Sequence, residues 1–127
     1  AMTRSLKAQA PENLEFCAYL ALYPTIRSTV DYGPLASRPI RLFMGTLDEA
    51  TSITTVRAFA ESQRAAGADI KLFEYEGAHH AFDNPEFRTP VLARVSGAMF
   101  TVAYHPQAHA RIQKDIQQTL AEVFAKQ

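Results

Sequence analysis

Residues 38–48 read Arg-Pro-Ile-Arg-Leu-Phe-Met-Gly-Thr-Leu-Asp, and this stretch decides the fold. Pro39 is followed by a largely apolar run from Ile40 to Met44, which Gly45 closes. Short apolar runs bounded by turn residues are typical of strands that are buried on both faces of a parallel sheet. The sequence therefore predicts a buried strand with an acidic residue, Asp48, in the loop at its C-terminal end.

A second apolar run lies upstream of this strand. Every residue from Phe16 to Tyr23 is apolar, and Pro24 ends the run. We expect another strand of the same parallel sheet here, followed by a connecting loop over residues 25–38. Residues 2–10 resemble the last turns of a helix that has neither an N-cap nor a full apolar stripe. We therefore expect that the ancestral sequence extended further upstream.

A helix and a third strand are expected downstream. Residues 52–66 have apolar side chains at helical spacing, and Gly67 stands where a C-terminal cap belongs. The members of this apolar stripe are Ile53, Val56, Phe59 and Ala60. Residues 69–75 alternate in part between apolar and polar, which favours a strand nearer the edge of the sheet.

The last third of the chain is less regular. After a turn-rich stretch, residues 92–102 are apolar enough for a core segment, but their pattern does not distinguish a helix from a strand. Pro106 opens a final helix. Its expected apolar stripe consists of Ile112, Ile116, Leu120, Val123 and Phe124. The order of elements predicts an α/β fold of about three mostly parallel strands with flanking helices.

Composition excludes several classes of protein. The 127 residues fit a single domain, and 13 basic residues balance 13 acidic ones, so the sequence gives no electrostatic sign of nucleic-acid binding. No apolar run is long enough to span a membrane, and no signal-like segment opens the chain, so we expect a cytoplasmic protein. Cys17 is the only cysteine, which excludes an internal disulfide, and we interpret it as a buried packing thiol.

Two loops carry residues that could do chemistry. Asp48 follows one predicted strand, and His79 and His80 follow the next. The C-terminal ends of parallel strands meet at one edge of a sheet, and an acid followed by a histidine is the order that α/β-hydrolases require. A neutral imidazole takes the proton of a weak hydroxyl or thiol nucleophile, and a carboxylate fixes its tautomer. We predict that Asp48 orients His80 and that His80 is the general base.

Less specific interpretations of the histidines and aromatic residues also have to be considered. His80 could merely stabilise a loop by hydrogen bonds, and His79, His80 and Asp83 could suggest a metal site. Adjacent residues rarely point at one ion, and no His-Glu-x-x-His pattern surrounds His105 and His109, so we expect no metal and no cofactor. We interpret Tyr19, Tyr23, Tyr75 and Phe82 as packing residues, among which Phe82 is the best candidate for lining a pocket.

The motifs around the acid and the base resemble the final third of dienelactone hydrolases, a family of the α/β-hydrolase superfamily. The resemblance covers residues 38–48, a helix that ends in Ala-Ala-Gly, and Phe-Glu-Tyr-Glu-Gly-Ala-His-His-Ala-Phe at 73–82. It implies the C-terminal part of an α/β-hydrolase fold and the hydrolysis of carboxylic esters or lactones by a Ser/Cys-His-Asp triad. Matched to that family's Gly-x-x-Asp and Gly-Ala-x-His-Ala-Phe motifs, Asp48 is the triad acid and His80 the base.

The family's nucleophile motif has no counterpart in the sequence. Gly-x-Ser-x-Gly and Gly-x-Cys-x-Gly are both absent from the 127 residues. We therefore expect little ester chemistry from this chain alone, and a small ester or lactone substrate only if an N-terminal part completes it. The alternative is a truncated gene product that acts as a dimeric binding or structural module. For a chain that stands alone we predict a homodimer through the strand Phe16–Tyr23, because an uncovered apolar strand edge favours association.

Overall fold

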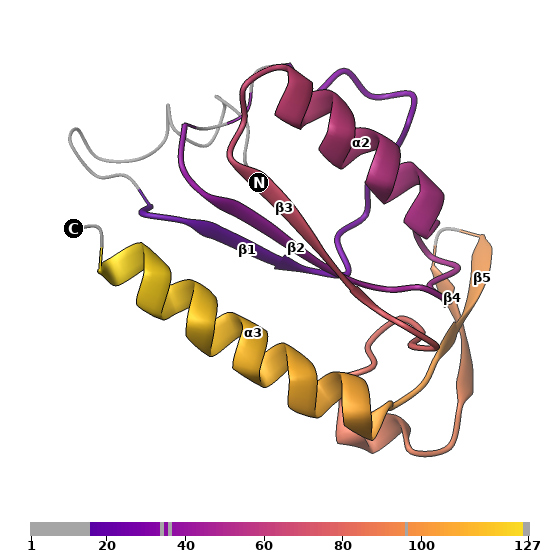
Figure 1. Cartoon of the computed structure of the whole chain (residues 1–127). Helices are drawn as coiled ribbons and strands as arrows, with labels where there is room; N and C mark the ends of the chain where they lie inside the picture. The colour runs from indigo at the N-terminus through magenta and orange to yellow at the C-terminus, as the bar shows by residue number, and fades with distance from the viewer. Residues whose placement is uncertain (1–15, 34, 36, 96, 126–127) are drawn as a thin grey trace.

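A computed structural model of the chain describes residues 16–33, 35, 37–95 and 97–125. Three strands form a sheet with a helix on each face, so that the molecule has three layers (Figure 1). In chain order the elements are β1 (Tyr19–Leu22), β2 (Ile40–Gly45), α2 (Ile53–Ala65), β3 (Ile70–Tyr75), the short 3₁₀ helix η1 (Pro85–Phe87), β4 (Val91–Val95), β5 (Ala98–Val102) and α3 (Pro106–Phe124). None of the described helices is long and apolar enough to cross a membrane.

The sheet has the order β1-β2-β3, and both pairs of strands are parallel. This confirms the predicted α/β fold with a parallel sheet. β2 lies in the middle and is almost wholly buried, as its apolar sequence predicts. β1 is shorter than the predicted strand, and its four residues are only half-buried because it lies at the edge. Phe16, which we expected at the start of this strand, is 72% exposed. The predicted helix at residues 2–10 lies outside the described residues.

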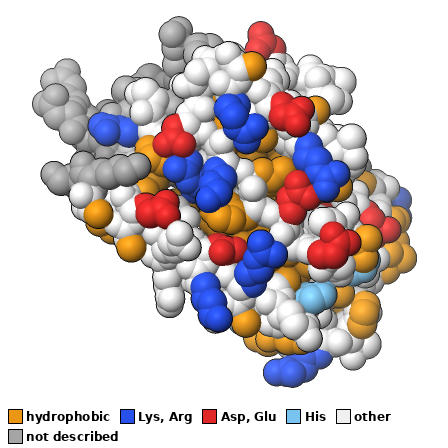
Figure 2. Space-filling view, viewed as in Figure 1, with side chains coloured by type: hydrophobic (Ala, Val, Ile, Leu, Met, Phe, Trp, Pro, Cys, Tyr) orange, Lys and Arg blue, Asp and Glu red, His pale blue; other side chains and the backbone are white. Residues whose placement is uncertain are grey.

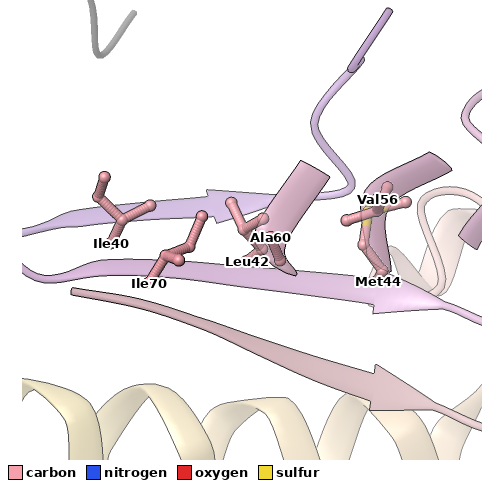
Figure 3. Close-up of a cluster of buried hydrophobic side chains, with 6 residues drawn as sticks. All are labelled: Ile40, Leu42, Met44, Val56, Ala60 and Ile70. Carbon is pink, nitrogen blue, oxygen red and sulfur yellow. The ribbon is translucent and has the colours of Figure 1, made fainter. Parts of the chain in front are cut away.

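One apolar layer fills the space between the sheet and α2. Alternate residues of β2 point to this face and meet one side of the helix, as the periods of a strand and a helix require. The buried members are Ile40, Leu42, Met44, Val56, Ala60 and Ile70 (Figure 3). Ile53 and Phe59 pack against this cluster, which confirms the predicted stripe. Gly67, with φ of +90°, follows the helix in a left-handed conformation that suits glycine.

A second apolar layer lies between the sheet and α3. Its buried members are Phe43, Tyr75, Ala78, Phe82, Ala108 and Ile112. The predicted stripe of α3 is confirmed at Ile112 and Val123, which are buried, but it is wrong at Leu120 and Phe124, which are 39% and 61% exposed, whereas Thr119 is buried. At roughly 100° per residue, Leu120 and Phe124 are turned by about 80° and about 120° from Ile112, whereas Thr119 is turned by about 20°.

Residues 92–102, which we expected to be a core segment, belong instead to an antiparallel hairpin of β4 and β5. Gly97, with φ of +87°, lies in its turn. Leu92, Val95 and Met99 are each more than half exposed, because the hairpin lies beside the parallel sheet and only part of β5 contacts the body of the protein (Figure 1). Figure 2 shows hydrophobic side chains at the surface on that side, while basic and acidic side chains intermingle over the rest of this face.

Candidate active site

Asp48 lies in the tight turn that follows β2. Its backbone N–H donates to the carbonyl oxygen of Gly45 at 3.3 Å. Its carboxylate oxygen Oδ1 accepts hydrogen bonds from the backbone N–H groups of Ala50 and Thr51, at 2.9 and 3.1 Å. The side chain is completely buried. A buried carboxylate is costly unless it is hydrogen-bonded, so these two donors, which directly precede α2, account for its placement.

His80 binds the second oxygen of this carboxylate through a hydrogen bond. Its Nδ1 lies 2.9 Å from Oδ2 of Asp48, and its side chain is 20% exposed. Because an ionised carboxylate only accepts, the proton of the neutral imidazole belongs on Nδ1, which leaves a lone pair on Nε2. Among the described residues none hydrogen-bonds Nε2. The pair thus has the arrangement of an oriented base whose second nitrogen is available.

The turns that carry the acid and the base are fastened to each other. Leu47 N–H donates to the carbonyl oxygen of Ala78 at 3.0 Å, and Gly77 N–H donates to Oγ1 of Thr46 at 2.9 Å. Any Cβ atom at Gly45 would collide with the carbonyl oxygen of Ala78, so the close approach of the two turns requires glycine there. Sequence spacing alone places both residues at the sheet edge, and these contacts set the distance between them.

Two aromatic residues contact the imidazole, of which Tyr23 was expected only to pack and Phe100 was not singled out by the sequence. The ring centroid of Tyr23, just beyond β1, is 4.6 Å from that of His80, and the centroid of Phe100 in β5 is 5.1 Å away. Tyr23 has φ of 38°, in the left-handed region that residues other than glycine rarely adopt. Burial raises the pKa of the Tyr23 phenol, and the nearby Asp83 carboxylate raises it further. The phenol is therefore neutral at physiological pH.

The carboxylate of Glu49 links the acid's turn to the hairpin. Its Oε2 accepts a hydrogen bond from the backbone N–H of Thr101 at 2.7 Å. This bond lowers the pKa of the Glu49 carboxyl. The position of Glu49 next to Asp48 was visible in the sequence, whereas its partner in β5 was not.

Other residues considered from the sequence lie away from the pair. Phe82 is completely buried against Tyr75, which confirms that it is a packing residue and contradicts its place as the best candidate for lining a pocket. The side chain of His105 caps the N-terminus of α3 by accepting from Ala108 N–H at 3.2 Å. No group of three or more potential metal ligands occurs in the part of the chain that the structure describes. Cys17 is half-buried, whereas we expected it to be buried.

A surface cavity of about 460 Å³ lies elsewhere. It is lined by residues of the loop that follows β1 and by α2, including Tyr32 and Phe59. Neither Asp48 nor His80 contributes to it. The cavity and the acid–base pair are therefore separate features of the molecule.

The sequence matches the family model described as dienelactone hydrolase family over residues 6–124. The chain belongs to the dienelactone hydrolase family. Two solved structures have a similar fold. A dienelactone hydrolase-like promiscuous phosphotriesterase, P91, from metagenomic libraries is 17% identical, with a TM-score of 0.61 over 84% of this chain and 42% of the other. Esterase 2 of Thermogutta terrifontis, phosphonylated by cyclosarin, is 22% identical, with a TM-score of 0.57 over 90% of this chain and 46% of the other.

The match to solved members of this fold is partial in length. This dienelactone hydrolase family chain spans less than half the length of each of these two solved chains. A comparison with curated proteins gives no match. These comparisons show the family and the fold of the chain.

Proposed function

We propose that Asp48 and His80 are the acid and the base of a Ser/Cys-His-Asp triad that hydrolyses carboxylic esters or lactones. The hydrogen bond of 2.9 Å between Asp48 Oδ2 and His80 Nδ1 is the observation that carries this proposal. Membership of the dienelactone hydrolase family supports the reaction class. The burial of the acid and the partial exposure of the base support their separate roles.

The chemistry of such a pair follows from its geometry. The lone pair on Nε2 of His80 accepts the proton of a hydroxyl or thiol while the oxygen or sulfur attacks the ester carbonyl carbon. The imidazolium then returns the proton to the leaving alkoxide, and Asp48 stabilises the positive charge in between. In the second half of the cycle His80 takes a proton from water, which attacks the acyl intermediate, and then returns that proton to the departing nucleophile as the carboxylic acid is released.

The nucleophile of this reaction has no counterpart in the sequence. The 127 residues contain no Gly-x-Ser-x-Gly or Gly-x-Cys-x-Gly motif. An acid–base pair without nucleophile and oxyanion donors does little acyl transfer. We therefore propose that this chain alone hydrolyses esters no faster than buffer, and that the pair acts when a segment bearing the nucleophile completes it.

Turnover of p-nitrophenyl acetate tests both parts of this proposal. The 127-residue chain, His80→Ala and the control His105→Ala should all match the buffer rate. A rate that His80→Ala abolishes and His105→Ala keeps would refute the inactivity of the chain while supporting the base. Sequencing the gene upstream of Met2 identifies any in-frame Gly-x-Ser/Cys-x-Gly elbow. If the longer product with that elbow turned over ester equally well with His80→Ala, the role of His80 would be refuted.

A second candidate function, a dimeric binding or structural module, is favoured by the edge of β1. Tyr19 and Tyr23 N–H groups donate to Pro39 and Phe43 on the side of β2, so alternate N–H groups, those of Leu20 and Leu22, point to the opposite edge. Within the described residues no strand pairs with that edge. We propose that two copies pair through Phe16–Tyr23 about a two-fold axis. A monomer by light scattering at micromolar concentration would refute this.

A further inference from the structure

The imidazole of His80 contacts an aromatic ring on each of two elements that lie far apart in the sequence. Tyr23 approaches it with the ring planes tilted by 58°, and Phe100 approaches it edge-on, with the planes at 66°. Asp48 holds Nδ1 at 2.9 Å. A single hydrogen bond leaves a ring free to rock about the donor–acceptor line, whereas neighbouring rings at van der Waals distance restrict that motion.

Tyr23 is itself firmly held. Its backbone N–H donates to the carbonyl oxygen of Phe43 at 2.8 Å, which extends the ladder of β1 and β2 by one bond. Its ring meets the ring of the buried Phe82 edge-on, with centroids 6.2 Å apart. The backbone of Tyr23 is thus held by β2 and its ring by Phe82, and a ring held in this way can restrict the imidazole of His80.

The backbone around this contact is strained on both sides. Tyr23, with φ of 38°, and Ala81, with φ of 56°, are the non-glycine residues with positive φ within the described ranges. Tyr23 carries the ring that packs against His80, and Ala81 directly follows His80 in the chain. Strained backbone persists where the surrounding structure over-determines it, and it concentrates at functional sites. Both strained residues therefore belong to the placement of this one imidazole.

Phe100 is anchored through its neighbours in β5. The next residue, Thr101, donates its N–H to Glu49 Oε2, and Val102 forms a parallel β-bridge with His80. Phe100 itself is only 8% exposed. Three consecutive residues of the hairpin thus contact the imidazole, the turn that carries the acid, and the backbone of the base. This arrangement fixes the hairpin to both halves of the pair.

We propose that Tyr23 and Phe100 are positioning residues that clamp the His80 imidazole, so that its Nδ1–H stays on Asp48 and its Nε2 stays free to accept a proton. The clamp extends the proposed function, because it presumes that the base role of His80 requires a fixed ring. Neither residue needs to touch the substrate. The aromatic ring of Tyr23 carries the effect, and the phenol oxygen is dispensable.

Nitrogen-15 spectra of the histidine rings in the full chain test this directly, because the shifts of Nδ1 and Nε2 report the tautomer. In the native chain we expect His80 to show two well-separated ring nitrogens with the proton on Nδ1. Tyr23→Leu and Phe100→Leu should each bring the two shifts closer together and broaden them through exchange between tautomers. Tyr23→Phe should keep the native pattern.

A matched control comes from a second histidine with an aromatic neighbour. The ring of Tyr104 meets that of His109 edge-on at 5.6 Å, so Tyr104→Leu should change the His109 signals and leave those of His80 alone. Unchanged methyl signals of Val56 and Ile70 show that each variant is folded. Folded Tyr23→Leu and Phe100→Leu chains with native His80 nitrogen shifts would overturn the clamp, as would a Tyr23→Phe chain that loses them.

This readout does not depend on ester turnover. Native His80 spectra in the Tyr23 and Phe100 variants would reject the clamp without affecting the proposed acid and base roles. An activity result that rejects the triad would not alter the His80 spectra. The two proposals can therefore be rejected separately.

Discussion

The carbonyl oxygen of Ala78 occupies the space that a Cβ atom of Gly45 would need. Gly45→Ala therefore forces the turns of the acid and the base apart. We expect a loss of stability on the order of 1–3 kcal/mol, typical of overpacking, together with loss of the native His80 nitrogen pattern. Urea unfolding and nitrogen-15 spectra measure the two effects. Gly33→Ala, in open space, should leave the His80 pattern native, and a native pattern in Gly45→Ala would contradict this prediction.

Asp48→Asn should reverse the tautomer of His80. The amide oxygen of Asn can still accept from the N–H groups of Ala50 and Thr51, so its NH₂ group then faces Nδ1 of His80. Nδ1 must become an acceptor, and the proton moves to Nε2. Nitrogen-15 spectra should show this exchange of roles. In a product that carries the nucleophile, kcat should fall by about 10⁴-fold. Asp69→Asn, which alters an exposed ion pair with Arg41, serves as control, and a native tautomer in Asp48→Asn would rule out the assigned hydrogen bond.

Glu74 should make stability depend on pH in the acid range. Arg57 donates two hydrogen bonds to its carboxylate and lowers its pKa. The stabilisation is complete above the unfolded pKa of about 4.3 and is lost as the pH falls through the lower folded value. Because the pair lies at the surface, the loss should not exceed about 1 kcal/mol.

Urea unfolding between about pH 5 and pH 2.5 measures this effect, since that window includes the unfolded pKa of a glutamate. Glu74→Gln should reduce the slope of stability against pH, whereas Glu61→Gln, also a surface change, should not. Equal slopes for native protein and Glu74→Gln would show that the ion pair contributes nothing in solution.

Leu20→Pro should abolish the proposed dimer, because proline removes an N–H that points to the free edge of β1. Leu20→Ala is the matched control, since it removes the same side chain and keeps the N–H. Light scattering should give a monomer for the proline variant and a dimer for the alanine variant. Two dimers would exclude pairing through this edge, provided that circular dichroism shows both variants folded.

The parallel sheet and its two helices were predictable because apolar runs bounded by turn residues indicate the buried strands, and apolar stripes at helical spacing indicate the helices. β2 and α2 form at the predicted positions, since apolar residues bounded by Pro39 and Gly45, and a stripe that includes Val56 and Ala60, leave little choice. The hairpin was not predictable. Its apolar residues resemble a core segment, and only tertiary contacts decide that Leu92 and Met99 face outwards.

The candidate site was predictable in part. Strand order places Asp48 and His80 at one sheet edge, and the described geometry brings them within hydrogen-bond distance. The contacts of Tyr23 and Phe100 could not be derived, because each depends on the path of a loop rather than on a period. The one local signal was an aromatic residue at the very end of a predicted strand. Phe82 was preferred as a candidate pocket residue because it is closer to His80 in the sequence. In the structure the chain turns at Ala81, which has a positive φ, and Phe82 is completely buried.

The fastening of the two turns by Leu47 and Ala78 has a consequence for reconstitution. The contacts that join acid and base all lie between Gly45 and Val102, so the pair is assembled before any other fragment arrives. A separately expressed piece that bears a nucleophile would need only to dock beside His80. It would not have to induce the hydrogen bond between Asp48 and His80. Under the proposed function, this chain and such a piece would act as the two halves of a split enzyme, in which activity reports association.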